Sequence, residues 1–182
     1  MQLRSRPPRT SNEYLIRSTN DVIWVMREAS DEDLEFAFRS DHKVWSLFTE
    51  LLNEYGFQIP QNIESIILDR CNEFVSALCD LKKQYKVERP YRQARKFGIQ
   101  MPNTYTKSTS GFGYSYPSCH AGQSRFYAHA IAQSLGDNLS DPQRYEIFNL
   151  ANRIGFSRIQ LGVHSIQDIR EGQRLADQRF GV

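Results

Sequence analysis

The sequence predicts an all-α protein, a bundle of helices in a single domain, and three observations lead to this prediction. Apolar residues recur at helical spacing in several segments, and residues that favour helix starts stand directly before them. The alternation of apolar and polar residues that is typical of strands is scarce throughout. The chain has 182 residues, of which 40% are hydrophobic, so it is long enough to form one domain with its own core.

The chain is expected to divide into a short arm and one helical domain. Residues 1–12 contain three arginines and two prolines and lack a helical pattern, which predicts a flexible basic arm. Residues 13–182 are expected to form the single helical domain. They contain no internal repeat and no glycine-rich nucleotide-binding pattern.

The first helical pattern runs from residue 31 to residue 55, and a break is expected near residues 40–41. Ser30, followed by Glu32 and Asp33, suits the position directly before a helix. The buried stripe of this segment is expected to comprise Trp45, Phe48, Leu51 and Leu52.

A second helix is expected after Asn62, which suits the capping position. Its apolar stripe comprises Ile63, Ile67, Cys71, Phe74, Leu78 and then Leu81 or Lys82. Lys82 lies on the apolar face, about three turns after Cys71, where a lysine is rarely found without a partner. Two interpretations stay open: a lysine that reaches solvent from the helix end, or a lysine with a specific partner.

Pro90 ends this helix or begins another segment, and a polar loop rich in Gly and Ser is expected over residues 98–118. The next helix should begin near Pro117 and Ser118 and end in a turn at residues 136–138. Its expected stripe comprises His120, Ser124, Tyr127, Ile131 and Leu135.

The last two helices are expected to begin at Ser140 or Asp141 and at Ser165, and the second should end before Gly181. One face of the earlier helix carries Phe148, Ala151, Gly155, Arg158 and Gly162. The small residues on this face indicate close packing against a neighbour. Arg158 is therefore a second cation that points into an apolar setting.

Three short segments contain the residues that we expect to carry chemistry. The first holds Lys82, six intervening residues and then Arg89 and Pro90. The second is Pro117, Ser118, Cys119 and His120. The third holds Ser157 and Arg158, five intervening residues, His164, three intervening residues and Asp168.

Together these segments resemble the tripartite signature of the type 2 phosphatidic acid phosphatase superfamily, which includes bacterial non-specific acid phosphatases and vanadium haloperoxidases. The usual pattern is K-x6-RP, PSGH and SR-x5-H-x3-D, and every position matches except the glycine, which is Cys119 here. The resemblance covers about residues 82–168. It implies a helical bundle of the kind found in that superfamily, with residues 13–182 as the catalytic domain.

The resemblance also implies a role for each matching residue. His164 would be the nucleophile that forms a phosphohistidine, Asp168 would orient its ring, and His120 would exchange protons with the leaving group and water. The phosphate-binding residues that it implies are Lys82, Arg89, Ser118, Cys119 and Arg158. It implies no metal ligand and no cofactor, and vanadate is expected to act as an inhibitor.

The residue types suit this chemistry independently of the resemblance. A phosphate dianion in a dry pocket needs fixed donors, which the two arginines supply in planar pairs and Lys82 as a point charge. Ser118 lies at an expected helix start, where main-chain N–H groups bind anions. Asp168 follows His164 by four residues, so it shares a helical face with that ring and can accept its N–H.

Structural interpretations stay open beside the catalytic ones. Asp168 completes a capping-box pattern, His120 suits a core histidine, and Arg158 suits an ion pair with a buried carboxylate. Cys119 can replace glycine if its backbone is helical, and its thiol is a conceivable nucleophile. Two histidines match no motif and are interpreted as structural, His42 and His129.

The composition limits which classes of binding partner and which cellular compartment are expected. Lys and Arg total 23 and Asp and Glu total 21, so the net charge of +2 argues against a nucleic-acid binder that relies on bulk charge. The three cysteines lack the spacing of a zinc site or a disulfide scaffold. Neither an apolar leader nor a run of 18 apolar residues is present, so a cytoplasmic protein without a membrane partner is expected.

The function that these observations favour is metal-independent hydrolysis of phosphoric esters or anhydrides of a small soluble substrate. Two alternatives stay open. One is a vanadate-dependent haloperoxidase, in which vanadate would be the cofactor, and the other is a catalytically degenerate anion-binding protein. The sequence leaves the physiological substrate undetermined and is compatible with a homo-oligomer.

Overall fold

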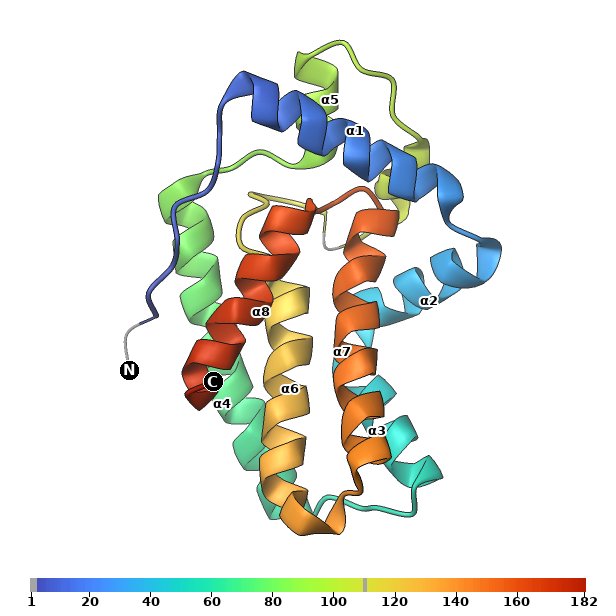
Figure 1. The fold of residues 1–182 in the computed structure, drawn as a ribbon, viewed down its shortest axis with the longest axis vertical. Coiled ribbons are helices and arrows are strands. Elements are labelled where there is room, and N and C mark those ends of the chain that lie inside the picture. Colours follow the sequence, from blue (N-terminus) through green and yellow to red (C-terminus); the bar gives the residue numbers. More distant parts are fainter. Residues whose placement is uncertain (1–2, 110) are drawn as a thin grey trace.

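Helices α4 (Gln61–Tyr85), α6 (Cys119–Leu135), α7 (Asp141–Gln160) and α8 (Ile166–Phe180) run along the long axis of the molecule (Figure 1). This computed structural model describes residues 3–109 and 111–182, and all regular secondary structure in them is helical. The prediction of an all-α, single-domain bundle is confirmed. None of the described helices is long and apolar enough to cross a membrane.

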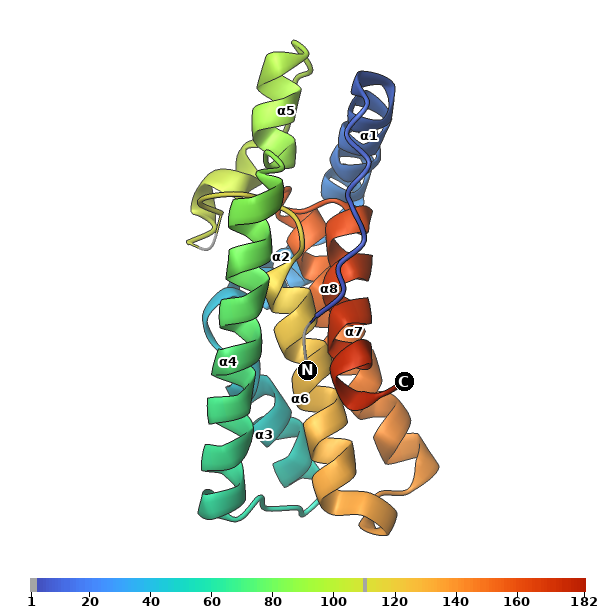
Figure 2. The same cartoon turned by 90° about the vertical axis from the view of Figure 1, so that its left-hand side faces the viewer.

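The remaining helices cover one end and one side of this bundle. Helices α1 (Asn12–Glu28) and α5 (Pro90–Lys96) pack against each other at one end, as Figures 1 and 2 show. Helices α2 (Asp31–His42) and α3 (Val44–Glu54) pack against α7. Short 3-10 helices span Asn103–Lys107 and Gly136–Asn138. Helix α1 was not among the helices that the sequence predicted.

The main core lies where α3, α4, α6, α7 and α8 meet, as the apolar stripes predict. The buried stripe residues of α4 are Ile67, Cys71, Phe74 and Leu78. Those of α6 are Ser124, Tyr127 and Ile131, and those of α7 are Ala151, Gly155 and Arg158. The helical periodicity read from the sequence is therefore confirmed in these three helices.

Helix starts follow the predicted capping residues with one exception. Capping boxes form at Ser30, Ser140 and Ser165. The prediction for Asn62 is wrong, because α4 already begins at Gln61, directly after Pro60. The break between α2 and α3 falls at Lys43, slightly after the predicted position.

A close crossing of α6 and α8 aligns the starts of these two helices. A Cβ atom on Gly172 would lie 2.3 Å from the carbonyl oxygen of Ser118, so α8 can approach α6 this closely only with glycine at residue 172. The amide of Ser118 donates to the carbonyl oxygen of Asp168 over 2.9 Å. The crossing therefore brings the second and third sequence motifs together.

The segment before α1 runs along α8 (Figure 1). The amide of Arg6 donates to Glu171 and the amide of Arg9 donates to Gln167, each over 2.8 Å. The hydroxyl of Tyr116 donates to the carbonyl oxygen of Arg6 over 2.6 Å. Composition alone predicted a flexible arm over residues 1–12 and gave no indication of these contacts.

Candidate active site

The three sequence motifs meet at one end of the bundle, where α4 and α7 end and α6 and α8 begin (Figure 1). Lys82 lies in the last turn of α4, and Arg89 immediately precedes α5. The second motif forms the start of α6, and Arg158 lies in the last turn of α7. The chain then passes through His164 and enters α8 ahead of Asp168.

His164 is buried, with 3% of its surface exposed, and both of its ring nitrogens have partners. Nε2 lies 2.8 Å from Nη1 of Arg89. Because a guanidinium group can only donate, Nε2 is the acceptor. Nδ1 then carries the proton, and it lies 3.4 Å from Oδ2 of Asp168 and 3.3 Å from Oγ of Ser115. The ring thus has an unprotonated Nε2, which is the atom that nucleophilic attack requires.

Burial and nearby cations keep this ring neutral. Burial lowers the pKa of His164 well below its ordinary value, and the charges of Arg89 and Lys82 lower it further. His120 and Arg158 act on the same pKa in the same direction, so both lie within electrostatic reach of the ring. A neutral imidazole is the form that can attack an electrophile.

Asp168 is both a helix cap and the partner of His164. Its Oδ2 accepts from the amide of Ser165 over 2.7 Å and from the hydroxyl of Ser115 over 2.5 Å. Its Oδ1 is buried and has no hydrogen-bond partner within residues 3–109 and 111–182. Burial raises the pKa of Asp168, and the hydrogen bonds from the two serines oppose that rise. The capping and catalytic interpretations are therefore compatible with each other.

Lys82 and Arg89 both donate to one loop beside His164. Nζ of Lys82 donates to the carbonyl oxygens of Tyr114 and Ser115 over 3.0 and 2.7 Å. Nη2 of Arg89 donates to the carbonyl oxygen of Phe112 over 2.9 Å. Burial lowers the pKa of Lys82 to about 8. The main-chain oxygens of this loop therefore occupy the N–H donors of Lys82 and Arg89 that are expected from the sequence to bind a phosphate group.

Arg158 is fully buried and is paired within the protein. Its Nη1 lies 2.5 Å from Oδ1 of Asp41, and its Nη2 donates to Oγ of Ser40 over 2.8 Å and to the carbonyl oxygen of Ala37. Burial lowers the pKa of Arg158 to about 10, and the carboxylate of Asp41 opposes this shift. The structure therefore contains the ion pair with a buried carboxylate that was one interpretation of Arg158.

His120 lies in the first turn of α6 and faces the same aspartate. Its Nε2 is 3.2 Å from the carbonyl oxygen of Asp41 and 3.9 Å from Oδ1 of Asp41. Burial lowers the pKa of His120 to about 4, and the charge of Arg158 lowers it further. The ring lies beside a hollow of about 350 Å³, which residues 41–46, Gln123 and Tyr127 also line. A group bound at His120 therefore has open space next to it.

Ser118 and Cys119 are the cap and the first residue of α6. Oγ of Ser118 accepts from the amide of Ala121 over 3.3 Å. Among the described non-glycine residues only Lys86 has a positive φ, so position 119 does not need the freedom of glycine. The hydrogen bond with Cys79 and then burial raise the pKa of Cys119, which disfavours a nucleophilic thiolate at this residue.

Sequence reasoning missed two residues that complete the site, Asp41 and Ser115. Asp41 is separated from Arg158 by 117 positions, so no local spacing could reveal the pair. Ser115 lies in the polar loop and resembles its neighbours in composition. The only signal was indirect, because an inward-facing arginine requires a buried acceptor.

The two histidines outside the motifs have different surroundings. His129 on α6 lies 2.7 Å from Oδ1 of Asp177 and stacks on the ring of Phe180. These contacts agree with a structural role. His42 lies at the hollow beside His120, and its ring is within hydrogen-bond distance of Oγ1 of Thr109.

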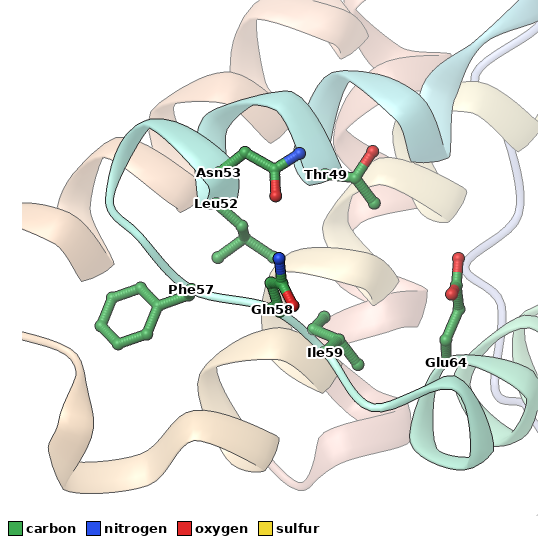
Figure 3. A pocket seen from close by; sticks show the side chains of 7 residues that line it. All are labelled: Thr49, Leu52, Asn53, Phe57, Gln58, Ile59 and Glu64. Carbon is green, nitrogen blue, oxygen red and sulfur yellow. The ribbon is translucent and has the colours of Figure 1, made fainter.

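Another hollow, of about 210 Å³, lies between α3 and the start of α4 (Figure 3). Its lining comprises Thr49, Leu52, Asn53, Phe57, Gln58, Ile59 and Glu64. None of the residues that the motifs single out lines it. It is therefore separate from the candidate site.

No protein-family model matches the chain, and no curated protein matches its sequence. Within residues 3–109 and 111–182, no three His, Cys, Asp or Glu side chains are grouped so that they could hold a metal ion. The candidate active site is therefore defined by its geometry, with His164 between Arg89 and Asp168.

Proposed function

We propose that this protein is a phosphoric ester hydrolase of the type 2 phosphatidic acid phosphatase superfamily that acts on a small soluble substrate through a phosphohistidine at His164. The observation that carries the proposal is the placement of His164, with Arg89 at Nε2 and Asp168 at Nδ1. A neutral nucleophile beside a fixed cation, with a carboxylate behind it, suits attack on a phosphate group.

In the first step, Nε2 of His164 attacks phosphorus, and the bond between phosphorus and the leaving oxygen breaks. The ring becomes a cation when it is phosphorylated, and Asp168 at Nδ1 stabilises that charge. Burial keeps His120 neutral in the free protein, so the ring takes up its proton when the phosphate dianion binds, because that negative charge favours the imidazolium form. The protonated His120 then donates this proton to the leaving oxygen. We assign the remainder of the leaving group to the hollow that His120 lines, which His164, Arg89 and Lys82 do not line.

In the second step, water attacks the phosphorus of the phosphohistidine. His120 is now neutral and accepts a proton from this water. The bond between phosphorus and Nε2 breaks, so inorganic phosphate leaves and His164 returns to its neutral form. Each histidine thus returns to the protonation state that it had in the substrate complex, and His120 releases its proton when phosphate leaves.

Lys82 and Arg89 are the cations that would hold the phosphate group. Both donate to carbonyl oxygens of the loop that contains Phe112 and Tyr114, so substrate binding requires phosphate oxygens to replace some of these acceptors. Arg158 is assigned a different role. Its partner is Asp41, so it acts on the phosphate through its charge and through the position of His120.

The test is hydrolysis of p-nitrophenyl phosphate by the purified protein in the presence of EDTA. The proposal predicts turnover that EDTA leaves unchanged and that vanadate inhibits, because vanadate can mimic the five-coordinate state at His164. The His164→Asn variant should be inactive. The matched control is His129→Asn, since His129 lies outside the site and is paired with Asp177.

Three outcomes would contradict the proposal. Strict dependence on added magnesium or zinc would indicate metal-assisted hydrolysis. Oxidation of bromide by peroxide in the presence of vanadate, without phosphatase turnover, would indicate a haloperoxidase. Phosphate binding without turnover of any of a panel of aryl, sugar and nucleoside monophosphates would indicate an anion-binding protein.

A further inference from the structure

Two cysteines from different helices lie in contact next to the candidate site. Sγ of Cys79 on α4 is 3.8 Å from Sγ of Cys119, the first residue of α6. Both side chains are partly exposed. The third cysteine, Cys71, lies on α4 within the core and has no exposed surface.

The surroundings of the two thiols shift their pKa values in opposite directions. The hydrogen bond from Cys119 lowers the pKa of Cys79 to about 6, and the charges of Lys82 and Lys83 act in the same direction. The same hydrogen bond and burial raise the pKa of Cys119. Either sulfur can donate in this contact, and the directions of the two pKa shifts favour Cys119 as the donor and Cys79 as the acceptor. Burial raises the pKa of Cys71 to about 12, so this thiol stays protonated.

We propose that Cys79 and Cys119 form an oxidisable dithiol site for hydroperoxides, in which Cys79 is the attacking sulfur and Cys119 the resolving sulfur. This site goes beyond the proposed hydrolysis and does not depend on it. Contact between the sulfurs, partial exposure of both and the positive charge of Lys82 and Lys83 on the same helix carry the inference.

In the proposed reaction, one molecule of hydrogen peroxide oxidises the two thiols to a disulfide. The Cys79 sulfur attacks one peroxide oxygen, the O–O bond breaks, and the products are a sulfenic acid and, after protonation, one water. The Cys119 sulfur then attacks the sulfenic sulfur, the S–O bond breaks, and a second water leaves. The two thiols lose two electrons in total, and the peroxide gains them.

Closing the disulfide requires the sulfurs to approach from 3.8 Å to about 2.05 Å. Cys119 is the first residue of its helix, where the chain is least constrained by helical hydrogen bonds. The disulfide would link α4, which carries Lys82, to the start of α6, which carries His120. Oxidation would therefore act directly on the candidate active site.

The experiment treats the wild-type protein with hydrogen peroxide and digests it without reduction, using trypsin and Glu-C. Cleavage after Glu73 separates Cys71 from Cys79, so the peptides identify the partners. We expect a cross-link between the peptides that contain Cys79 and Cys119 within one chain, and an unmodified Cys71. A disulfide only between chains, or a cross-link through Cys71, would overturn the proposal.

Variants separate the two roles. In Cys119→Ser the sulfenic acid at Cys79 should persist and be trapped by dimedone, whereas Cys79→Ser should give no rapid adduct at Cys119. The Cys71→Ala variant is the matched control and should behave like the wild type.

The peroxide reaction rate of Cys79 should stay nearly constant from pH 7 to pH 8.5, whereas an ordinary thiol gains about tenfold over that range. A tenfold rise at Cys79, or faster trapping at Cys119 than at Cys79, would overturn the assignment. Neither readout involves phosphatase turnover, so failure here is distinct from failure of the proposed function.

Discussion

Nη1 of Arg89 lies 2.8 Å from Nε2 of His164, which makes the guanidinium a donor to the ring nitrogen that would attack phosphorus. The contact fixes the tautomer of His164, because the proton must then reside on Nδ1. It also places a permanent positive charge beside the point of attack. Under the proposed function, Arg89 would donate to the oxygens of a bound phosphate group and leave Nε2 available for phosphorus.

Substitution of Arg89 should therefore affect catalysis strongly even when its charge is kept. We expect Arg89→Lys to lower kcat/KM for p-nitrophenyl phosphate by about 10²–10³-fold, because lysine cannot reproduce the planar pair of donors. Arg92→Lys is the matched control, since Arg92 lies on the exposed face of α5 and should leave kcat/KM unchanged. If the two variants are equally active, Arg89 does not bind the phosphate group.

The double role of Asp168 can be separated experimentally. Asp168→Asn replaces the carboxylate beside Nδ1 of His164 with a neutral amide and weakens the helix cap, so it should lower kcat by at least about 10²-fold. Ser165→Ala removes a capping hydroxyl but keeps the carboxylate. It should cost about 1 kcal/mol of unfolding free energy and leave kcat within a few-fold of wild type. Steady-state kinetics and urea unfolding of both variants test this prediction. If both variants lose the same fraction of kcat, Asp168 acts only as part of the helix cap.

The fold and the candidate site differ in how far the sequence could predict them. Helices α4, α6 and α7 were predicted because residues at helical spacing mark one face of each, and α8 was predicted from Ser165 before it and Gly181 after it. Ser118, Ser140 and Ser165 cap the starts of α6, α7 and α8. Helix α1 was missed because two of its five buried residues, Ser18 and Thr19, are polar and interrupt the apolar pattern.

The predicted site residues share one end of the bundle, but their partners were not predictable. Arg158 has Asp41 as its acceptor, and Lys82 and Arg89 donate to main-chain oxygens of the loop after residue 111. Such contacts depend on how distant segments pack, and a single sequence holds no local pattern for them. Spacing could indicate which residues gather, but it could not indicate what each one binds in the absence of substrate.

His120 leads to a prediction that depends on the leaving group. If this histidine is the general acid, His120→Ala should lower kcat/KM by about 10²–10⁴-fold for an alkyl phosphate, whose leaving oxygen needs a proton. The loss should be much smaller for p-nitrophenyl phosphate, whose leaving group is stable as an anion. Parallel kinetics on the two substrates give the ratio, and equal losses on both would exclude the acid role.

Acidification should destabilise the fold through His120. Its pKa is about 4 in the folded protein and about 6.5 in the unfolded chain, so between these values only the unfolded chain binds the proton. Stability is therefore lost as the pH falls below about 6.5, and this residue should account for about 2–3 kcal/mol between pH 7 and pH 4.5. Urea unfolding of wild type and His120→Gln at both pH values tests this. The variant should lose correspondingly less stability on acidification, and an identical loss would show that His120 is not the responsible group.

The most direct test of the central claim is to trap the covalent intermediate. The protein is mixed with a labelled phosphoric ester, quenched in alkali and digested, and the labelled residue is identified by mass spectrometry. The account predicts phosphate on His164, stable in alkali and lost in acid, and no label in the His164→Asn variant. Label on Cys119, or steady hydrolysis with no label on His164 at any quench time, would contradict the mechanism.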